Sequence, residues 1–237
     1  MKTVSKGLLL RTIDYSDSSA IAKVFTHNQG VQSFLIRGVK GKRKKTAYLQ
    51  PLCLIELEYH LHPNKDLLVV GNIRHLDSYQ SIPTHPHKRM VALFLAEVLG
   101  QTIKTDHIDE PLFDYLHTRL LMFDLEDWYP NFHLIFLAGL TRFLGFYPLL
   151  SNHPRCFDLQ NGAFLPNAMS DSQVVTGREA ELLFEFFTAP WEQAKAIKLD
   201  RATRNNLTEH LTAFYMNHAA GMRPIKSLDV LHAVLHD

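Results

Sequence analysis

The 237-residue sequence contains only two cysteines, Cys53 and Cys156, too few for a disulfide framework or a cysteine-rich zinc site. No Cys-x-x-Cys or His-Glu-x-x-His motif occurs. The 14 histidines are scattered, and the closest pair, His85 and His87, has a proline between its members, which indicates a turn. Cys53 lies in an apolar run and is interpreted as a small core residue. We therefore expect neither a metal ion nor a cofactor.

Motifs of catalysis and of membrane insertion are also missing. The chain has no phosphate-binding P-loop, no Gly-x-Gly-x-x-Gly and no Gly-x-Ser-x-Gly motif. The carboxylate pair Asp14 and Asp17 lies in a Ser- and Asp-rich turn, where solvent exposure explains it better than catalysis. No apolar run reaches the length of a membrane span, and the start of the chain does not read as a secretory signal. These absences predict a cytoplasmic protein that is not an enzyme.

Charge is nearly balanced over the whole chain but unevenly distributed. The net charge is +1, yet residues 1–80 hold 12 Lys and Arg against 6 Asp and Glu, whereas residues 81–237 hold 13 against 18. Such asymmetry predicts two domains, 1–80 and 81–237, with an anionic ligand on the first.

The basic residues concentrate in one segment. Residues 37–45 read Arg-Gly-Val-Lys-Gly-Lys-Arg-Lys-Lys, with six basic residues and no acidic one. Two glycines make a helix unfavourable there and favour a loop. A cationic loop suits a phosphate backbone, which is recognised by its charge, although a solvated loop or a targeting signal would have the same composition. We take nucleic acid as the predicted ligand.

Five short strands are predicted in the basic part of the chain. Their sequences are rich in Val, Ile, Phe and Leu, and turn residues separate them. The strands span residues 7–13, 20–27, 31–37, 52–59 and 67–75. Glu56 and Glu58 alternate with apolar neighbours, which predicts one solvent-exposed face. Five strands without an intervening long helix predict a small closed barrel of the oligonucleotide-binding (OB) type.

The pattern changes to a helical period after residue 81. Helices are predicted over residues 90–104, from an N-cap at Asp109 to about residue 123, and over residues 131–146, with further helices after residue 176. Thr176 and Glu179 form the pattern of a capping box. The Asn161-Gly162 dipeptide predicts a hairpin inside an irregular insertion at residues 147–175. The predicted fold class is α+β: an N-terminal five-stranded OB-type barrel and an all-α helical domain with a small hairpin insertion.

Candidate DNA-binding residues follow from this fold. Arg37 ends a predicted strand, and other basic side chains lie in the loop or in the same domain. The set is Arg37, Lys40, Lys42, Arg43, Lys44, Lys45, Arg11 and Lys23, with Tyr48 as an aromatic residue next to the loop that could stack on a base. Phe34 and Tyr59 are weaker stacking candidates, and Phe34 is better explained as barrel core. In the helical half, Arg142 on an apolar helix could bind a carboxylate of a partner, although a solvent-exposed arginine is the simpler explanation.

Several short motifs occur in a characteristic order. They are Gly7-Leu8-Leu9-Leu10-Arg11-Thr12 with Asp14-Tyr15 and Asp17, Phe25-Thr26 with Gly30, Arg37-Gly38-Val39, Leu49-Gln50-Pro51, Ile55-Glu56-Leu57, Leu144-Gly145-Phe146-Tyr147-Pro148 and Arg223-Pro224-Ile225-Lys226-Ser227. In this order they resemble the RecO family of recombination mediators over nearly the whole chain. Many members of that family carry a four-cysteine zinc module after the Leu-Gly-Tyr/Phe segment. This sequence has only Cys156 there, so the resemblance implies no zinc.

The resemblance implies a non-enzymatic protein of DNA repair and recombination. Proteins of this family bind single- and double-stranded DNA and anneal complementary strands. They work with RecR and with the acidic, apolar C-terminal tail of single-stranded DNA-binding protein, and so help to place the recombinase RecA on DNA. The expected location is then the cytoplasm, at the nucleoid. Two alternatives stay open from the residues alone: an adaptor that binds only proteins through its basic loop, and a metal-dependent nuclease.

Overall fold

The computed structural model describes residues 2–39, 49–61, 65–104, 107–151, 154–167 and 173–235. The chain divides into two compact units, Met1–Glu126 and Asp127–Asp237. The change from strand to helix occurs earlier, between residues 77 and 86. The predicted boundary at residue 80 lies within this change from strand to helix. That it separates two domains stays a prediction.

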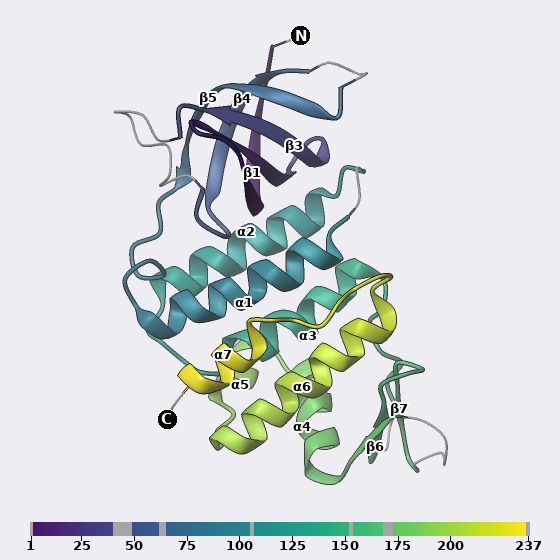
Figure 1. Ribbon diagram of the computed structural model, residues 1–237. Helices are drawn as coiled ribbons and strands as arrows, with labels where there is room; N and C mark the ends of the chain where they lie inside the picture. Colours follow the sequence, from purple (N-terminus) through teal and green to yellow (C-terminus); the bar gives the residue numbers. More distant parts are fainter. Residues whose placement is uncertain are drawn as a thin grey trace. The chain divides into compact units, whose positions relative to one another are not determined.

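A closed five-stranded barrel forms the beginning of the first unit (Figure 1). Its strands follow the order β1-β2-β3-β5-β4 around the barrel, with β3 and β5 parallel and every other pair antiparallel. The strands are β1 (Lys2–Ser16), β2 (Ser19–Thr26), β3 (Gly30–Arg37), β4 (Leu54–His60) and β5 (Leu67–Asp77). The predicted fold class is confirmed, and β1 is longer than predicted at both ends because it pairs with both β2 and β4.

Alternate side chains of each strand fill the barrel. Ala20, Ala22 and Val24 of β2 point inward and are almost fully buried, and Phe34 of β3 packs edge to face on Tyr59 of β4, with ring centroids 4.9 Å apart. Cys53 joins this core, as predicted, and its burial raises the pKa of the thiol to about 11.

Two helices complete the first unit: α1 (Pro86–Thr102) and α2 (Glu110–Leu125). The N-cap of α2 is Asp109, as predicted, and its carboxylate accepts a hydrogen bond from the Leu112 amide. Phe113 of α2 packs on Phe25, whose side chain points out of the barrel, with ring centroids 5.9 Å apart. Helix packing therefore explains why the outward residue Phe25 is fully buried.

A cluster of polar side chains, which we call the buried junction, binds the segment of residues 80–82 between the barrel and α1. The Asp124 carboxylate accepts hydrogen bonds from the amides of Gln80, Ser81 and Ile82, at 2.7, 2.9 and 2.8 Å. The Lys88 ammonium donates to the Ser81 hydroxyl and to the Asp124 carbonyl, at 2.7 and 3.0 Å. Both charged side chains are at most 3% exposed, so this junction is part of the core of the unit.

The second unit combines helices with a small sheet. The helices are α3 (Phe132–Leu144), α4 (Gly177–Thr188), α5 (Trp191–Ala196), α6 (Arg201–His218) and α7 (Leu228–Val234). The sheet has the order β7-β6-β8 and consists of β6 (Cys156–Asp158), β7 (Ala163–Leu165) and β8 (Val174–Thr176). The predicted hairpin is confirmed as β6 and β7, while β8 and the short helix α5 were not predicted.

Stacked aromatic rings hold this sheet against the helices. Phe157 stacks on Phe164 with centroids 4.3 Å apart, and Phe157 also contacts Phe214 of α6 at 5.1 Å. Phe187 of α4 packs edge to face on Phe164 at 5.8 Å. These contacts supply an apolar core at the place where the resemblance puts a zinc module in other family members.

The predicted capping box at the start of α4 is wrong, because the Thr176 side chain does not make the predicted hydrogen bond. Thr176 is the N-cap residue, but its side chain makes no capping hydrogen bond. The Glu179 carboxylate instead accepts hydrogen bonds from Asn206 and His210 of α6, each at 2.8 Å. The hydrogen bond from Asn206 and the contact with His210 lower the pKa of Glu179. The Glu179 carboxylate therefore joins α4 to α6, whereas the local sequence pattern predicts that it caps α4.

One histidine in the second unit is completely buried. His133 Nε2 lies 2.8 Å from the Thr208 hydroxyl, which donates its own hydrogen to the Arg204 carbonyl. Thr208 therefore accepts from His133, and Nε2 carries a hydrogen in the neutral ring. Burial lowers the pKa of His133 to about 3, and the nearby charges of Arg204 and His232 act in the same direction.

Acid is expected to unfold the protein partly through His133. Below its ordinary pKa of 6.5 the unfolded chain binds a proton that the folded chain excludes, so stability is highest above that pH and falls on acidification. The expected slope from this residue is about 1.4 kcal/mol per pH unit between the two pKa values. Urea unfolding from neutral to mildly acidic pH measures it. His133→Gln removes this slope, whereas His60→Gln, which changes an exposed ring, keeps it. Equal slopes in all three proteins would contradict the assignment.

Candidate nucleic-acid interface

The register of the barrel strands places basic side chains beside one another on its outer surface. Arg11 of β1 is the partner of Lys23 on β2, and Lys23 is the partner of Ser33 on β3. Ser33 in turn pairs with Leu67 of β5. Partners in neighbouring strands lie about 5 Å apart, so Arg11 and Lys23 form a pair of adjacent cations.

A second row runs parallel to the first and is entirely apolar. Ile13, Ile21, Leu35 and Val69 are successive partners across β1, β2, β3 and β5. Ile13 is 48% exposed and Val69 is 45% exposed, so both ends of this row offer apolar surface to solvent. We call the outward side chains of these two rows, together with Arg37, the four-strand face.

Arg37 completes the four-strand face at the end of β3. It is exposed, and it is the partner of Ser19 on the outer side of β2. Tyr15 lies in the bulge at the end of β1 and is 61% exposed. Three cations and one exposed ring thus surround the apolar row.

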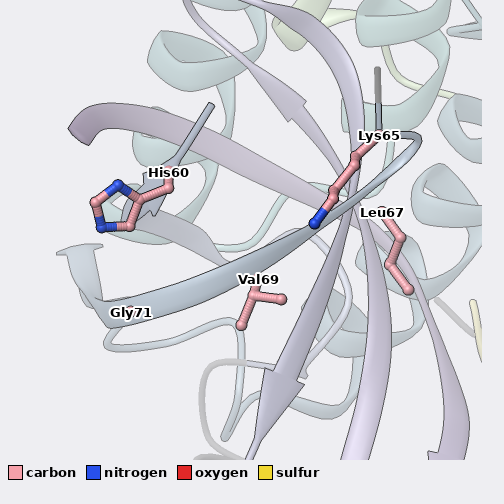
Figure 2. A pocket seen from close by; sticks show the side chains of 5 residues that line it. All are labelled: His60, Lys65, Leu67, Val69 and Gly71. Carbon is pink, nitrogen blue, oxygen red and sulfur yellow. The ribbon is translucent and has the colours of Figure 1, made fainter. Parts of the chain in front are cut away.

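A hollow of about 260 Å³ adjoins the four-strand face at β5 (Figure 2). Leu67, Val69 and Gly71 of β5 line it, together with His60 at the end of β4 and Lys65 before β5. In Figure 2 the His60 ring and the Lys65 ammonium lie to either side of Val69. In OB barrels the face of the second and third strands and the loop between the fourth and fifth strands bind oligonucleotides.

The other outer surface of the barrel has paired charges. Arg74 Nε lies 2.6 Å from the Glu56 carboxylate, and Lys2 Nζ lies 2.9 Å from Glu58. The hydrogen bond from Arg74 lowers the pKa of Glu56. The predicted exposed face of Glu56 and Glu58 is confirmed. Among the residues that the structure describes, no carboxylate forms such a pair with Arg11, Lys23 or Arg37, so those cations are available to an external anion.

The structure brings some of the predicted site residues together. Arg11, Lys23 and Arg37 share the four-strand face. The other predicted DNA-binding residues, Lys40, Lys42, Arg43, Lys44, Lys45 and Tyr48, lie outside the described residues. Phe34 and Tyr59 are buried in the barrel, which excludes them from base stacking.

Sequence reasoning missed the apolar row and the hollow. Ile13, Tyr15, Val69, His60 and Lys65 were not predicted as site residues. The outward positions of each strand can be recognised by alternation, but only the pairing of strands shows that these positions meet.

Arg142 is held against the end of a helix in the second unit. Its guanidinium donates to the Phe187 carbonyl of α4 at 3.1 Å and lies 4.6 Å from the centre of the Tyr147 ring. The Tyr147 hydroxyl also donates to the Phe187 carbonyl, at 2.7 Å. Leu149 and Leu150, close by in the sequence, are 72% and 49% exposed. The arginine is therefore fixed against Tyr147 and the end of α4, while its predicted role toward a partner stays a prediction.

The described part of the chain contains neither a candidate membrane span nor a candidate metal site. None of the helices combines the length and the apolarity needed to cross a membrane. No group of three or more His, Cys, Asp and Glu side chains within the described ranges is arranged to hold a metal ion.

Comparison with known proteins covers nearly the whole chain. The family model "Recombination protein O N terminal" matches residues 1–79, and "Recombination protein O C terminal" matches residues 84–229. The DNA repair protein RecO of Bacteroides fragilis is 34% identical over 236 residues, which cover 97% of each chain. That of Christiangramia forsetii is 30% identical over 234 residues, 97% of this chain and 98% of its own. The chain belongs to the RecO family of DNA repair and recombination proteins.

Proposed function

We propose that this RecO-family protein is a non-enzymatic mediator of recombination that binds single- and double-stranded DNA and anneals complementary strands. Residues 1–80 form the DNA-binding part, and residues 81–237 present the surface for protein partners. The observation that carries the proposal is the four-strand face, where Arg11, Lys23 and Arg37 surround exposed apolar side chains on an OB-type barrel. Such a protein would act in the cytoplasm at the nucleoid.

Phosphate groups fit the cations of this face. Arg11 and Lys23 are adjacent across two strands, and Arg37 begins the basic segment that continues to Lys45. Binding of phosphates to these side chains releases counterions, so affinity is expected to depend steeply on salt. Because phosphates carry no sequence information, this interaction would act on any DNA sequence.

Bases fit the apolar row between the cations. An unpaired base has two flat apolar faces, and single-strand binding proteins place such bases on exposed rings and apolar side chains. Ile13 and Val69 offer apolar surface, and Tyr15 offers a ring at the edge of the same face. A single strand could therefore lie across β1, β2, β3 and β5 with its phosphates on the basic side chains.

Annealing would follow from charge neutralisation. Two complementary strands repel each other through their phosphates, and a protein that binds both reduces that repulsion. The four-strand face and residues 40–45 together supply eight basic side chains: Arg11, Lys23, Arg37, Lys40, Lys42, Arg43, Lys44 and Lys45. This number is enough for contacts to more than one strand.

The partner surface that we propose lies around Arg142. A guanidinium followed in the sequence by the exposed Leu149 and Leu150 suits a peptide that ends in a carboxylate and carries apolar side chains. The acidic, apolar C-terminal tail of single-stranded DNA-binding protein has this chemistry. The Phe187 carbonyl and Tyr147 hold the guanidinium in place before the partner arrives, which lowers the entropy lost on binding. RecR, and through it the recombinase RecA, complete the proposed set of partners.

The experiment that tests the proposal uses the full-length protein with labelled single-stranded and duplex DNA. Fluorescence anisotropy across a salt series is expected to show binding of both that weakens as salt rises, and mixing of complementary strands is expected to speed their annealing. Absence of DNA binding at low salt, combined with binding to RecR or to the tail peptide, would instead show an adaptor that binds only proteins. Cleavage of the DNA with added magnesium or manganese would contradict the non-enzymatic assignment.

A further inference from the structure

The hollow next to the four-strand face opens on the outside of the barrel. Its lining side chains point outward, and Val69 is 45% exposed. We propose that this hollow receives one nucleobase, turned out of a single strand whose phosphates lie along the neighbouring cations. The inference rests on the proposed DNA binding and adds to it a subsite that distinguishes single strands from duplexes.

Size and chemistry of the hollow fit a single base. Its volume of about 260 Å³ is below the range of about 300–1,000 Å³ found for sites that enclose drug-sized ligands. Leu67 and Val69 form an apolar floor, and the His60 ring forms one side (Figure 2). A base could stack on the imidazole and cover the two aliphatic side chains.

Lys65 adds the charge that a nucleotide requires. Its side chain lines the hollow, and its ammonium lies on the other side of Val69 from His60 in Figure 2. A nucleotide combines a flat apolar base with an anionic phosphate. The hollow offers the apolar side chains of Leu67 and Val69 to the base and the Lys65 ammonium to the phosphate. The Glu58 carboxylate, 3.9 Å from the position of a Cβ on Gly71, is paired with the Lys2 ammonium at 2.9 Å.

Continuity with the apolar row favours DNA over a protein side chain as the occupant. Val69 belongs both to the hollow and to the row that begins at Ile13, so one strand of DNA could cover both. Arg11 and Lys23 lie in the next row of the same face. A partner protein that filled the hollow would have to neutralise these cations as well.

The subsite would select single-stranded DNA. Bases of a duplex are paired and stacked, so turning one out costs the free energy of unpairing and unstacking. A single strand has no base pair to break, so the cost is smaller. The four-strand face could still hold the phosphates of a duplex, because phosphate contacts do not require free bases. Filling the hollow should therefore affect the two kinds of DNA differently.

Gly71→Leu fills the hollow without changing charge. A Cβ at Gly71 would lie 3.4 Å from the Glu58 carbonyl oxygen and 3.9 Å from the Glu58 carboxylate, both ordinary contacts, so the backbone accepts a side chain at this position. Asn72→Leu is the matched control, because it adds the same side chain at the next exposed position of β5, outside the hollow. Thermal unfolding of both variants checks that the barrel is intact, and His60→Ala, which removes the ring, provides a second test.

The probes are a short oligothymidine, a strand of equal length made of abasic residues, and a duplex. Gly71→Leu is expected to bind oligothymidine about tenfold more weakly than the wild type, in the range measured for loss of one base-stacking contact. Its affinity for the abasic strand and for the duplex should stay within about twofold of the wild type. Asn72→Leu should bind all three probes like the wild type.

Three outcomes would overturn the inference. Equal loss on all three probes would show a general change of the barrel surface, and unchanged DNA binding would show that no base enters the hollow. Unchanged DNA binding with weaker binding to a protein partner would assign the hollow to that partner. If the wild type itself bound no DNA, the proposed function would fail, which is a different result from a failure of the subsite alone.

Discussion

Replacing Lys42, Arg43, Lys44 and Lys45 with glutamine is expected to weaken binding to single-stranded DNA by a factor of about 10²–10³ at moderate salt. Each phosphate contact contributes a slope of about 0.7 to the plot of log affinity against log salt, so loss of four contacts flattens the plot by up to roughly 3. Annealing of complementary strands should slow in parallel. Anisotropy titrations over a salt series measure the first effect, and a mixing assay measures the second.

A scrambled variant separates charge from sequence in this segment. Permuting residues 42–47 keeps all four cations and should keep the affinity and the salt slope of the wild type. These residues lie outside the described ranges, so the prediction depends on their charge and not on a conformation. If the glutamine variant kept the wild-type slope and annealing rate, the segment would not be part of the DNA site. If the scrambled variant lost as much as the glutamine variant, charge alone would not explain the effect.

Asp124→Ala is expected to lower the free energy of unfolding by about 3–5 kcal/mol. The carboxylate accepts three backbone amides of residues 80–82, and both it and the Lys88 ammonium contact the Ser81 hydroxyl. Truncation leaves the amides of residues 80–82, which are buried in part, without their acceptor. It also removes the carboxylate that shares the Ser81 hydroxyl with the buried Lys88. Urea unfolding at neutral pH measures the loss.

Asp127→Ala provides the comparison for this variant. Asp127 is exposed and lies three residues further along the chain, so its substitution removes the same charge from the surface. A change within about 0.5 kcal/mol is expected for that protein. Similar losses in both variants would mean that the buried junction does not stabilise the unit beyond an ordinary surface charge.

The barrel could be predicted because its sequence is locally consistent. Each strand alternates apolar and polar residues between turn-forming segments, and five such strands without long helices leave few alternatives to a closed sheet. The extension of β1 to Lys2 and Ser16 was missed because polar residues at both ends give no apolar alternation. Those residues are in strand conformation because β4 and β2 supply hydrogen-bond partners.

The candidate site could be predicted only in part. Arg11, Lys23 and Arg37 were recognised by charge, but the apolar row of Ile13 and Val69 depends on which strands are neighbours and on the bulges that shift their register. The parallel pairing of β3 with β5 places Val69 beside Leu35 across a long separation in sequence. Periodicity within one strand contains no information about such pairing.

In the helical half, local sequence patterns predicted where helices begin and end better than they predicted the hydrogen-bond partners of side chains. Asp109 caps α2 as predicted, and its carboxylate bonds to the Leu112 amide of the same helix. Glu179 has the spacing of a capping box, yet it bonds to Asn206 and His210, which approach from a helix about 30 residues away in sequence. Where a side chain can reach two hydrogen-bond partners, tertiary contacts decide which of them it bonds to.

A comparison of two triple variants tests most directly whether DNA lies on the four-strand face. Arg11→Gln, Lys23→Gln and Arg37→Gln together remove three cations from that face, and Lys6→Gln, Arg74→Gln and Arg89→Gln remove three exposed cations that lie outside it, on β1, β5 and α1. The first variant is expected to flatten the salt dependence of single-strand binding by about 2, and the second to leave it unchanged. Equal slopes in the two variants, or a loss only in the second, would contradict the account.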